Sequence, residues 1–168
     1  MFFALEPDEQ VRDQVQAIQR KFDGEGRAVK PGQFHITLAF LGMQPSNLIP
    51  ELCAIAAKLR FEPCNVMLDR LGSFRRAGVL WLGASSLPAA LLGFQQSLVE
   101  AIETTGIDRD RKDWKFHLTL FRRMSNLQTE TPIVPVKWAL NGFSLIESVS
   151  VKGGVEYYRK GHWTNEPV

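Results

Sequence analysis

Two stretches of the chain, FHITL at residues 34–38 and FHLTL at residues 116–120, are nearly identical. They lie near the starts of the two halves of the chain and differ only where one aliphatic residue replaces another. β-branched, aromatic and aliphatic residues dominate both, and polar and apolar positions alternate. The repeat therefore predicts two matching β-strands.

Because side chains alternate between the two faces of a strand, each stretch places a particular set of side chains on one face. Residues two apart on a strand share a face, so His35 and Thr37 point the same way while the aliphatic residues beside them face a core. His117 and Thr119 share a face in the second stretch for the same reason. A sheet that brings the strands together would place two imidazoles and two hydroxyls around one cleft.

This set of side chains suits phosphodiester cleavage without a metal. Imidazole has an unperturbed pKa of about 6.5, so one histidine can act as a base and another as an acid at cellular pH. The hydroxyls can donate to phosphoryl oxygens. Duplication of a purely structural strand would also give the repeat, but such a strand gains little from histidine on its polar face. Two of the three histidines fall at the same register of the repeat, which favours the catalytic interpretation.

The paired H-x-T-x motifs resemble those of the 2H phosphoesterases. FFAL at residues 2–5, HITLAFLG at residues 35–42, VLWLG at residues 79–83 and HLTLFR at residues 117–122 occur in that order. Together they are similar to the bacterial RNA 2',3'-cyclic phosphodiesterase branch, also called 2'-5' RNA ligase, over nearly the whole chain. One position departs from the family pattern: Phe116 stands where proline is common, which concerns the start of the strand and removes no catalytic group.

The resemblance implies an activity and a role for each motif residue. The substrate would be RNA with a 2',3'-cyclic phosphate end, tRNA fragments among them, or a cyclic nucleotide, opened by water to a 2'-phosphate. His117 would be the base that activates water and His35 the acid that protonates the departing 3'-oxygen, with Thr37 and Thr119 on the phosphoryl oxygens. The reverse reaction would make a 2'-5' linkage. No metal or other cofactor is expected.

Arg122 follows the second motif, and strict alternation predicts that it points away from the cleft. A bend or bulge after Leu120 would bring it back. The family motif often carries an arginine at this spacing, which implies a substrate or structural contact. A salt bridge on the far face of the strand is the alternative.

The fold class expected is α+β: two pseudo-symmetric lobes of antiparallel sheet with flanking helices, an active-site cleft between them, and one bilobal domain over residues 1–168. A helix, a loop and a motif strand recur in both halves, which predicts a pseudo-two-fold axis. The other predicted elements are strands at residues 1–6, 61–71 and 79–84, a helix that opens at Pro7-Asp8-Glu9 and carries an apolar stripe to Phe22, a loop at residues 24–32, helices at residues 46–60 and 88–105, and three short strands between residues 133 and 163.

Two loops flank the predicted cleft. Residues 72–78 contain Arg75 and Arg76 and form either a solvated hairpin tip or an arm that contacts phosphate or stacks on a base. Residues 108–115 are the most charged segment and lead directly into the second motif. Trp114 either stacks on a base or packs as part of a lid or core.

Composition narrows the class of protein. The 168 residues are 45% hydrophobic, enough for one substantial core, and the net charge of +2 gives no strong global attraction to nucleic acid. Cys53 and Cys64 have neither metal-ligand nor redox spacing, which is typical of a reduced cytoplasmic protein with buried thiols. No apolar run approaches the ~20 residues of a membrane helix. We expect a monomer that does not contact membranes.

Two other functions remain open from the residues. A module that binds a nucleotide or RNA end without turnover would use the same cleft, although arginine or lysine would serve phosphate binding as well as histidine. A zinc ion held by His35, His117 and His162 is the third option, but no carboxylate or thiol stands at ligand-like spacing beside them. His162 lacks a threonine partner, and we expect it to be exposed and inert.

Overall fold

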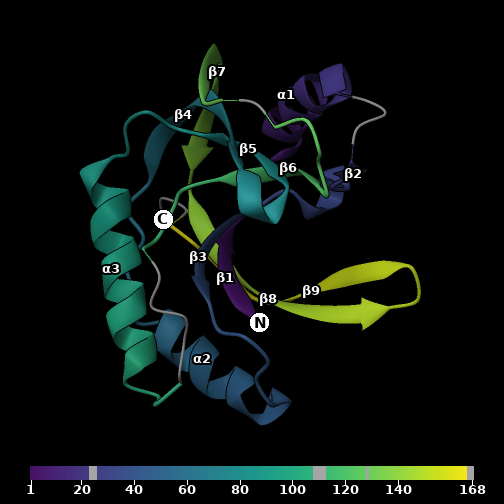
Figure 1. The fold of residues 1–168 in the computed structure, drawn as a ribbon. Coiled ribbons are helices and arrows are strands. Elements are labelled where there is room, and N and C mark those ends of the chain that lie inside the picture. Colours follow the sequence, from purple (N-terminus) through teal and green to yellow (C-terminus); the bar gives the residue numbers. More distant parts are fainter. Residues whose placement is uncertain (23–25, 108–112, 128, 166–168) are drawn as a thin grey trace.

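The computed structural model describes residues 1–22, 26–107, 113–127 and 129–165. Its strands are β1 (Phe2–Leu5), β2 (Arg27–Ala28), β3 (Ile36–Phe40), β4 (Cys64–Phe74), β5 (Val79–Gly83), β6 (Leu118–Arg122), β7 (Thr131–Leu140), β8 (Gly142–Val151) and β9 (Gly154–Thr164). Its α-helices are α1 (Glu9–Gln19), α2 (Ile49–Ala56) and α3 (Ala89–Glu103). Within the described residues, the strands form one sheet (Figure 1).

The two motif strands lie at the centre of this sheet. The order is β7-β4-β5-β6-β3-β1-β8-β9, with β2 paired to β6 off this path, and every pairing is antiparallel. Strand β3 opens one half with β1, β8 and β9, and β6 opens the other with β5, β4 and β7. The predicted pseudo-symmetric lobes are therefore confirmed, as two halves of one open sheet that meet between β3 and β6.

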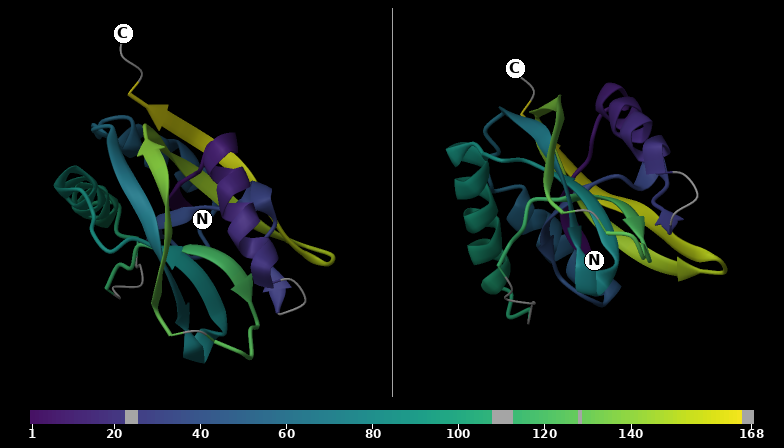
Figure 2. Two further views of the ribbon diagram at one scale, coloured as in Figure 1. Left: turned by 90° about the horizontal axis from the view of Figure 1, so that it is seen from above. Right: turned by 45° about the horizontal axis from the view of Figure 1, so that its top comes forward.

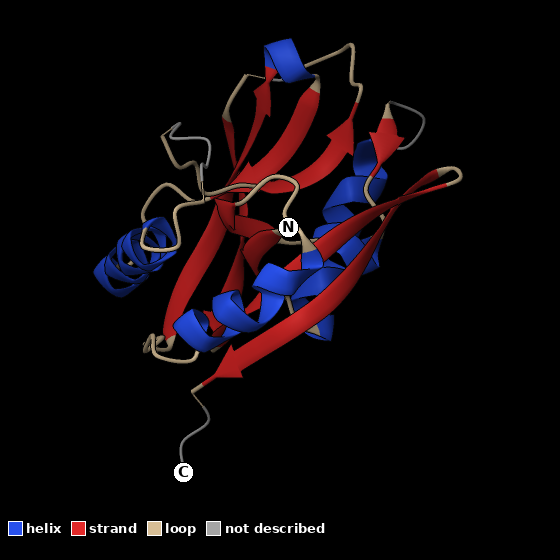
Figure 3. Ribbon diagram, turned by 90° about the horizontal axis from the view of Figure 1, so that it is seen from below, coloured by secondary structure: helices blue, strands red, loops and turns tan. Residues whose placement is uncertain are grey.

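Helices flank the sheet on opposite sides (Figures 2 and 3). Helix α1 begins after Asp8, whose carboxylate accepts a hydrogen bond from the Val11 amide, and it lies against β7. Helices α2 and α3 contact each other and lie against β9 and β3. The inward-facing motif residues Ile36 and Leu118 are fully buried, as the alternation predicted.

Several element boundaries differ from the prediction. Strand β2 forms within the predicted loop at residues 24–32. The helix predicted for residues 46–60 is a 3-10 turn at residues 46–48 followed by α2, which ends at Ala56. Strand β4 starts later than predicted and runs on to Phe74.

The C-terminal segment holds three strands, as predicted, but they are long. Strand β7 contains Pro132 and Pro135, which weakened the strand pattern in the sequence. Proline is tolerated there because β7 is an edge strand, where an amide hydrogen is not needed on the open side.

Among the described residues, no helix is long and apolar enough to cross a membrane.

Candidate active site

The pairing of β3 with β6 brings the two motifs together. The two strands pair at Ile36 and Leu118. Continuing this antiparallel register by one residue places His35 opposite Thr119 and Thr37 opposite His117. Each imidazole therefore lies across from the hydroxyl of the other motif, a crossing that the separate motifs did not predict.

Both imidazoles are held in the same way. The Nδ1 of His35 lies 2.7 Å from the carbonyl oxygen of Gln33, and the Nδ1 of His117 lies 2.8 Å from the carbonyl oxygen of Lys115. A backbone carbonyl only accepts hydrogen bonds, so each Nδ1 must carry the proton and donate. This leaves Nε2 of each ring free to take up or give a proton.

The electrostatics of the site act on both histidines. Burial is the main cause that lowers the pKa of His35 and of His117 below the ordinary value, and the Arg122 guanidinium lowers both further. The carbonyl hydrogen bonds oppose this effect. The positive form of His117 also lowers the pKa of His35.

A β-bulge occurs at the same place in each motif. In the pairing of β1 with β3, Phe3 opposes Ala39 and Ala4 opposes Thr37, so Leu38 is passed over. In the pairing of β5 with β6, the register passes over Leu120 in the same way. The two bulges occupy equivalent positions in the two copies of the motif.

The bulge at Leu120 is the irregularity that the sequence analysis required for Arg122 to reach the cleft, and strict alternation alone was wrong. Because one extra residue interrupts the alternation, Arg122 reaches the cleft and lines the same pocket as His35 and Thr119. The Leu120 carbonyl accepts hydrogen bonds from the Val29 amide at 2.9 Å and from the buried Gln19 amide group at 2.8 Å. These bonds fix the bulge from outside the motif, which explains why the motif alone did not reveal it.

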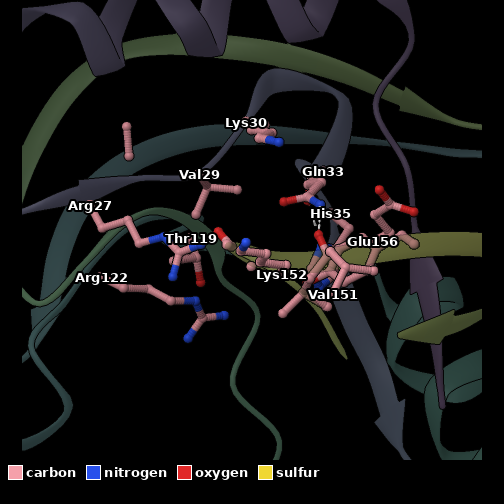
Figure 4. Close-up of a pocket in the computed structure, with 15 residues that line it drawn as sticks. Arg27, Val29, Lys30, Gln33, His35, Thr119, Arg122, Val151, Lys152 and Glu156 are labelled. Carbon is pink, nitrogen blue, oxygen red and sulfur yellow. Dashed lines mark hydrogen bonds between the residues drawn. The ribbon is translucent and has the colours of Figure 1, made fainter. Parts of the chain in front are cut away.

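The pocket lies on the His35 side of the seam (Figure 4). Its lining joins His35, Thr119 and Arg122 to β2, to Gln33 and to the turn between β8 and β9. Thr37 and His117 do not line this pocket; they lie on the other side of the crossing. Charged lining residues that the sequence analysis did not single out are Arg27, Lys30, Lys152 and Glu156. No local pattern marks them, because the contacts are made only when the hairpin folds beside β2.

Aromatic rings support the two imidazoles. The His35 ring lies 4.8 Å from the Phe2 ring and 5.4 Å from the Tyr157 ring, and the His117 ring lies 4.9 Å from the Phe74 ring, centroid to centroid. These apolar neighbours explain why burial dominates the pKa of both histidines.

The residues just before the second motif are structural. Trp114 donates from its indole nitrogen to the Thr37 carbonyl oxygen at 2.8 Å, which ties the approach to one motif to the strand of the other. Phe116 is buried and meets Trp114 edge-on. Phe34 is buried at the matching place before His35, so aromatic packing precedes both motif histidines.

The structure does not test the predicted substrate contacts of the two charged loops. Arg75 and Arg76 are exposed on a 3-10 turn at the tip of the β4–β5 hairpin, and their contact with substrate stays a prediction. Residues 108–112 of the charged segment lie outside the described residues. Cys53 and Cys64 form no disulfide and are half-buried, so the prediction of buried thiols was wrong.

His162 is exposed, as predicted, but it has a partner. Its Nδ1 lies 2.8 Å from the buried Ser144 hydroxyl, which donates to the Glu6 carboxylate at 2.5 Å. The zinc hypothesis required all three histidines at one site, and His162 lies in this separate contact. No group of three or more His, Cys, Asp or Glu side chains that could hold a metal occurs in the described part of the chain.

Comparison with known sequences gives a consistent family. A family model described as LigT-like phosphoesterase matches residues 5–81. A protein of Thermus thermophilus named RNA 2',3'-cyclic phosphodiesterase is 30% identical over 88% of this chain and 81% of its own length. The Escherichia coli protein of the same name is 28% identical over 97% of this chain and 94% of its own.

Solved structures show the same fold. The crystal structure of E. coli LigT complexed with 3'-AMP superposes with a TM-score of 0.86 at 27% identity, covering 97% of this chain and 95% of the other. The crystal structure of TT0787 from T. thermophilus superposes with a TM-score of 0.80 at 26% identity, covering 97% and 96%.

Proposed function

The chain belongs to the LigT-like phosphoesterase family of enzymes, and we propose that it hydrolyses RNA 2',3'-cyclic phosphate ends to 2'-phosphates by two-histidine acid-base catalysis. The observation that carries the proposal is the crossed pair of motifs. Two imidazoles, each with Nδ1 held by a carbonyl and Nε2 free, lie opposite each other's threonines. The names of the relatives support the choice of substrate.

The reaction requires one proton to be taken and one to be given. The Nε2 of His117 takes a proton from water as the water oxygen bonds to phosphorus. The bond from phosphorus to the 3'-oxygen breaks, and the Nε2–H of His35 gives its proton to that oxygen. The bond to the 2'-oxygen stays, so the product carries a 2'-phosphate and a 3'-hydroxyl.

Three further side chains act on the phosphoryl group. Thr37 and Thr119 donate hydrogen bonds to its non-bridging oxygens, and Arg122 balances the negative charge that grows in the transition state. The substrate anion also favours the protonated form of His35, which offsets the effect of burial on its pKa. These groups and the two imidazoles supply every proton and donor in the step, so the proposal assigns no role to a metal.

Ligation uses the same groups in the same roles. A 5'-hydroxyl of a second RNA takes the place of water and gives its proton to His117, and the departing 3'-oxygen takes a proton from His35. The product is a 2'-5' linkage. We propose ligation as a second outcome at the same site.

Binding without turnover is the alternative, and E. coli LigT has been crystallised with 3'-AMP and with ATP. A recognition module would gain affinity from Arg122 and the threonines. It would have no use for two imidazoles with lowered pKa, because a neutral imidazole binds phosphate less well than an arginine. The paired histidines therefore favour catalysis.

The proposal also covers the domain organisation, the oligomeric state and the cellular location of the protein. We propose that residues 1–168 act as one bilobal domain and as a monomer, in the cytoplasm, where unpaired thiols such as those of Cys53 and Cys64 stay reduced. The hydrophobic core that joins both halves of the sheet supports a single domain.

The test is a product assay on a short RNA that ends in a 2',3'-cyclic phosphate, with EDTA present. We expect wild type to yield a 2'-phosphate, identified against authentic 2'- and 3'-phosphate standards by chromatography and mass. His117→Ala should yield almost none, and the control His162→Ala should match wild type. Bound but unconverted RNA in wild type would favour the recognition module, and a 3'-phosphate product would contradict the assigned leaving oxygen.

A further inference from the structure

The pocket beside His35 is strongly positive. Four cationic side chains from strands β2 and β6 and from two loops line it, and we call them the basic pocket: Arg27, Lys30, Arg122 and Lys152. Figure 4 shows Arg27, Arg122 and Lys152 reaching toward the same space, with Lys30 farther along the rim. Among the described residues of the lining, Glu156 is the one carboxylate, and it accepts a hydrogen bond from Tyr158 at 2.6 Å. The side chains of the pocket therefore leave a clear excess of positive charge.

Two of these cations face each other directly. Arg27 on β2 pairs with Arg122 on β6, and cross-strand partners present their side chains on the same face. Like charges in such a pair destabilise a sheet unless an anion lies between them. None of the four cations forms an ion pair with a carboxylate among the described residues. An anionic ligand would relieve this repulsion.

Hydrogen bonds hold the segments that line the pocket in place. The Arg27 guanidinium donates to the Gly153 carbonyl oxygen at 3.1 Å, and the Gln33 amide group donates to the Val155 carbonyl oxygen at 2.7 Å. These bonds tie the turn of the β8–β9 hairpin to the segment before His35. A Cβ at Gly154 would lie 2.7 Å from Arg27 Nη2, so glycine at this position leaves room for the guanidinium.

The size of the pocket suits part of a ligand. Its volume is about 240 Å³. Pockets that enclose whole small molecules start at about 300 Å³. A pocket of this size, open to solvent and rich in cations, fits a phosphate group with part of a sugar.

The geometry of the proposed reaction indicates which phosphate of the RNA would occupy the basic pocket. Displacement at phosphorus is in line, so the water held by His117 and the 3'-oxygen protonated by His35 lie on opposite sides. The terminal ribose, which carries that oxygen, therefore lies on the His35 side. The phosphate attached to its 5'-oxygen must lie farther along the same side, where the basic pocket is.

We propose that Arg27 and Lys152 of the basic pocket bind the last internucleotide phosphate of the RNA, while Arg122 acts on the reacting phosphoryl group, and that the enzyme thereby selects cyclic ends of oligonucleotides over cyclic mononucleotides. This inference rests on the proposed function and adds a subsite to it. A 2',3'-cyclic mononucleotide has no such phosphate and leaves Arg27 and Lys152 without a ligand. An oligonucleotide places a negative charge between them.

The experiment compares kcat/KM for two substrates, 2',3'-cyclic AMP and triadenylate with a 2',3'-cyclic phosphate end. We expect wild type to prefer the trinucleotide by about tenfold or more, the range of one to two charge-assisted hydrogen bonds. Lys152→Gln and Arg27→Gln should each reduce this preference severalfold. Lys137→Gln, an exposed lysine on the far edge strand β7, is the matched control and should keep the wild-type preference.

A modified substrate identifies the contact itself. A trinucleotide with an uncharged methylphosphonate at its last internucleotide linkage should lose the advantage in wild type, and Lys152→Gln should no longer distinguish it from the natural trinucleotide. The slope of log KM against the logarithm of the salt concentration, measured for the natural trinucleotide, should also fall by about 0.7 for each cation removed.

Failure of the subsite and failure of the function give different results. If wild type converts both substrates but with equal kcat/KM, or if Lys152→Gln keeps the preference as Lys137→Gln does, the basic pocket is not the subsite. If wild type converts neither substrate, the proposed hydrolysis is itself wrong.

Discussion

At the scale of single residues, the chemistry depends on what surrounds each imidazole. A histidine held through Nδ1 by a carbonyl has one tautomer when neutral, with its lone pair on Nε2. Because the carbonyl accepts in both states, the ring can gain or lose the Nε2 proton without turning. The same bond at His35 and His117 thus prepares both rings for proton transfer.

Removing either imidazole should remove one proton transfer. His35→Ala and His117→Ala should each lower turnover on a cyclic-phosphate RNA by about two to four orders of magnitude. The assay is initial rate at saturating substrate, with His162→Ala as the control for loss of a histidine outside the cleft. Full activity in either variant would refute the paired assignment.

The threonines should matter less than the histidines. Thr37→Ala or Thr119→Ala removes one hydrogen bond to a charged oxygen and should cost about 1–3 kcal/mol of transition-state stabilisation. Comparison of kcat/KM for each variant with wild type measures this cost. Valine, which keeps the shape without the hydroxyl, should behave like alanine; activity equal to wild type in Thr→Val would rule out the hydrogen bond.

Arg122 should contribute, together with burial, to the pH range of the enzyme. Burial and the Arg122 charge lower the pKa of both histidines, so the bell-shaped profile of kcat/KM should peak below about pH 6.5, the unperturbed value. Arg122→Gln removes a positive charge that disfavours both imidazolium forms. The pKa of each ring then rises, and the peak should move to higher pH.

The neighbouring arginine provides the control for this shift. Arg123→Gln removes an equal charge one residue away, and Arg123 is not among the groups that shift the pKa of either histidine. Its profile should match wild type. A profile for Arg122→Gln that stays in place or moves to lower pH would contradict the electrostatic role.

The residues of the motif were predictable, and their surroundings were not. Alternation on a strand was enough to place His35 with Thr37, and His117 with Thr119, from the sequence alone. It misplaced Arg122, because the bulge at Leu120 depends on bonds from Gln19 and Val29, which are distant in sequence. Arg27 and Lys152 carried no signal because only the folded hairpin brings them to the pocket.

At the scale of elements, helix α1 supports the second motif from behind. Gln19 at its C-terminal end is buried and donates to the carbonyl oxygens of Val29 and Leu120, both at 2.8 Å. A helix that packs on a sheet ordinarily contributes apolar side chains. Here a polar one satisfies backbone groups that the bulge leaves without partners in the sheet.

Loss of this side chain should destabilise the fold. Gln19→Ala removes the hydrogen bonds to the Val29 and Leu120 carbonyl oxygens, of which only the Leu120 oxygen keeps another donor among the described residues, the Val29 amide, and should lower the free energy of unfolding by about 1–3 kcal/mol. Urea denaturation measures the change, and Gln14→Ala, on the exposed face of the same helix, is the control. Equal stability of the two variants would show that the Gln19 contacts contribute nothing.

Local sequence predicted the helices better than the strands, because some strand boundaries depend on pairing within the sheet. Apolar spacing correctly predicted α1 and α3, because amphipathic stripes are long and regular. It missed β2, two exposed residues whose only reason to be extended is the pairing with β6. Apolar spacing also predicted too short a strand for β7. Proline is compatible with this strand only because the strand lies at the edge of the sheet.

At the scale of the whole molecule, the sheet joins two similar halves at the seam that carries the chemistry. The pseudo-symmetry supplies two equivalent imidazole–hydroxyl pairs, and the surroundings then make them unequal. The β8–β9 hairpin and β2 enclose only the His35 side, whereas Phe74 flanks the His117 side. A symmetric centre with asymmetric flanks can bind a directional polymer in one orientation.

The continuous sheet and its shared core predict cooperative unfolding. Hydrophobic residues of both halves belong to one buried cluster, so neither half keeps its core when the other unfolds. Scanning calorimetry should show a single transition whose calorimetric and van't Hoff enthalpies agree. Two resolved transitions would mean that the lobes are separate domains.

The most direct test of the two-histidine mechanism is the pH dependence of kcat/KM for wild type, His117→Ala and His35→Ala on one cyclic-phosphate RNA. We expect wild type to give a bell. His117→Ala should lose the rising limb, which reports the base, and His35→Ala should lose the falling limb, which reports the acid. A residual activity that keeps both limbs in either variant would contradict the assignment of the two histidines as base and acid.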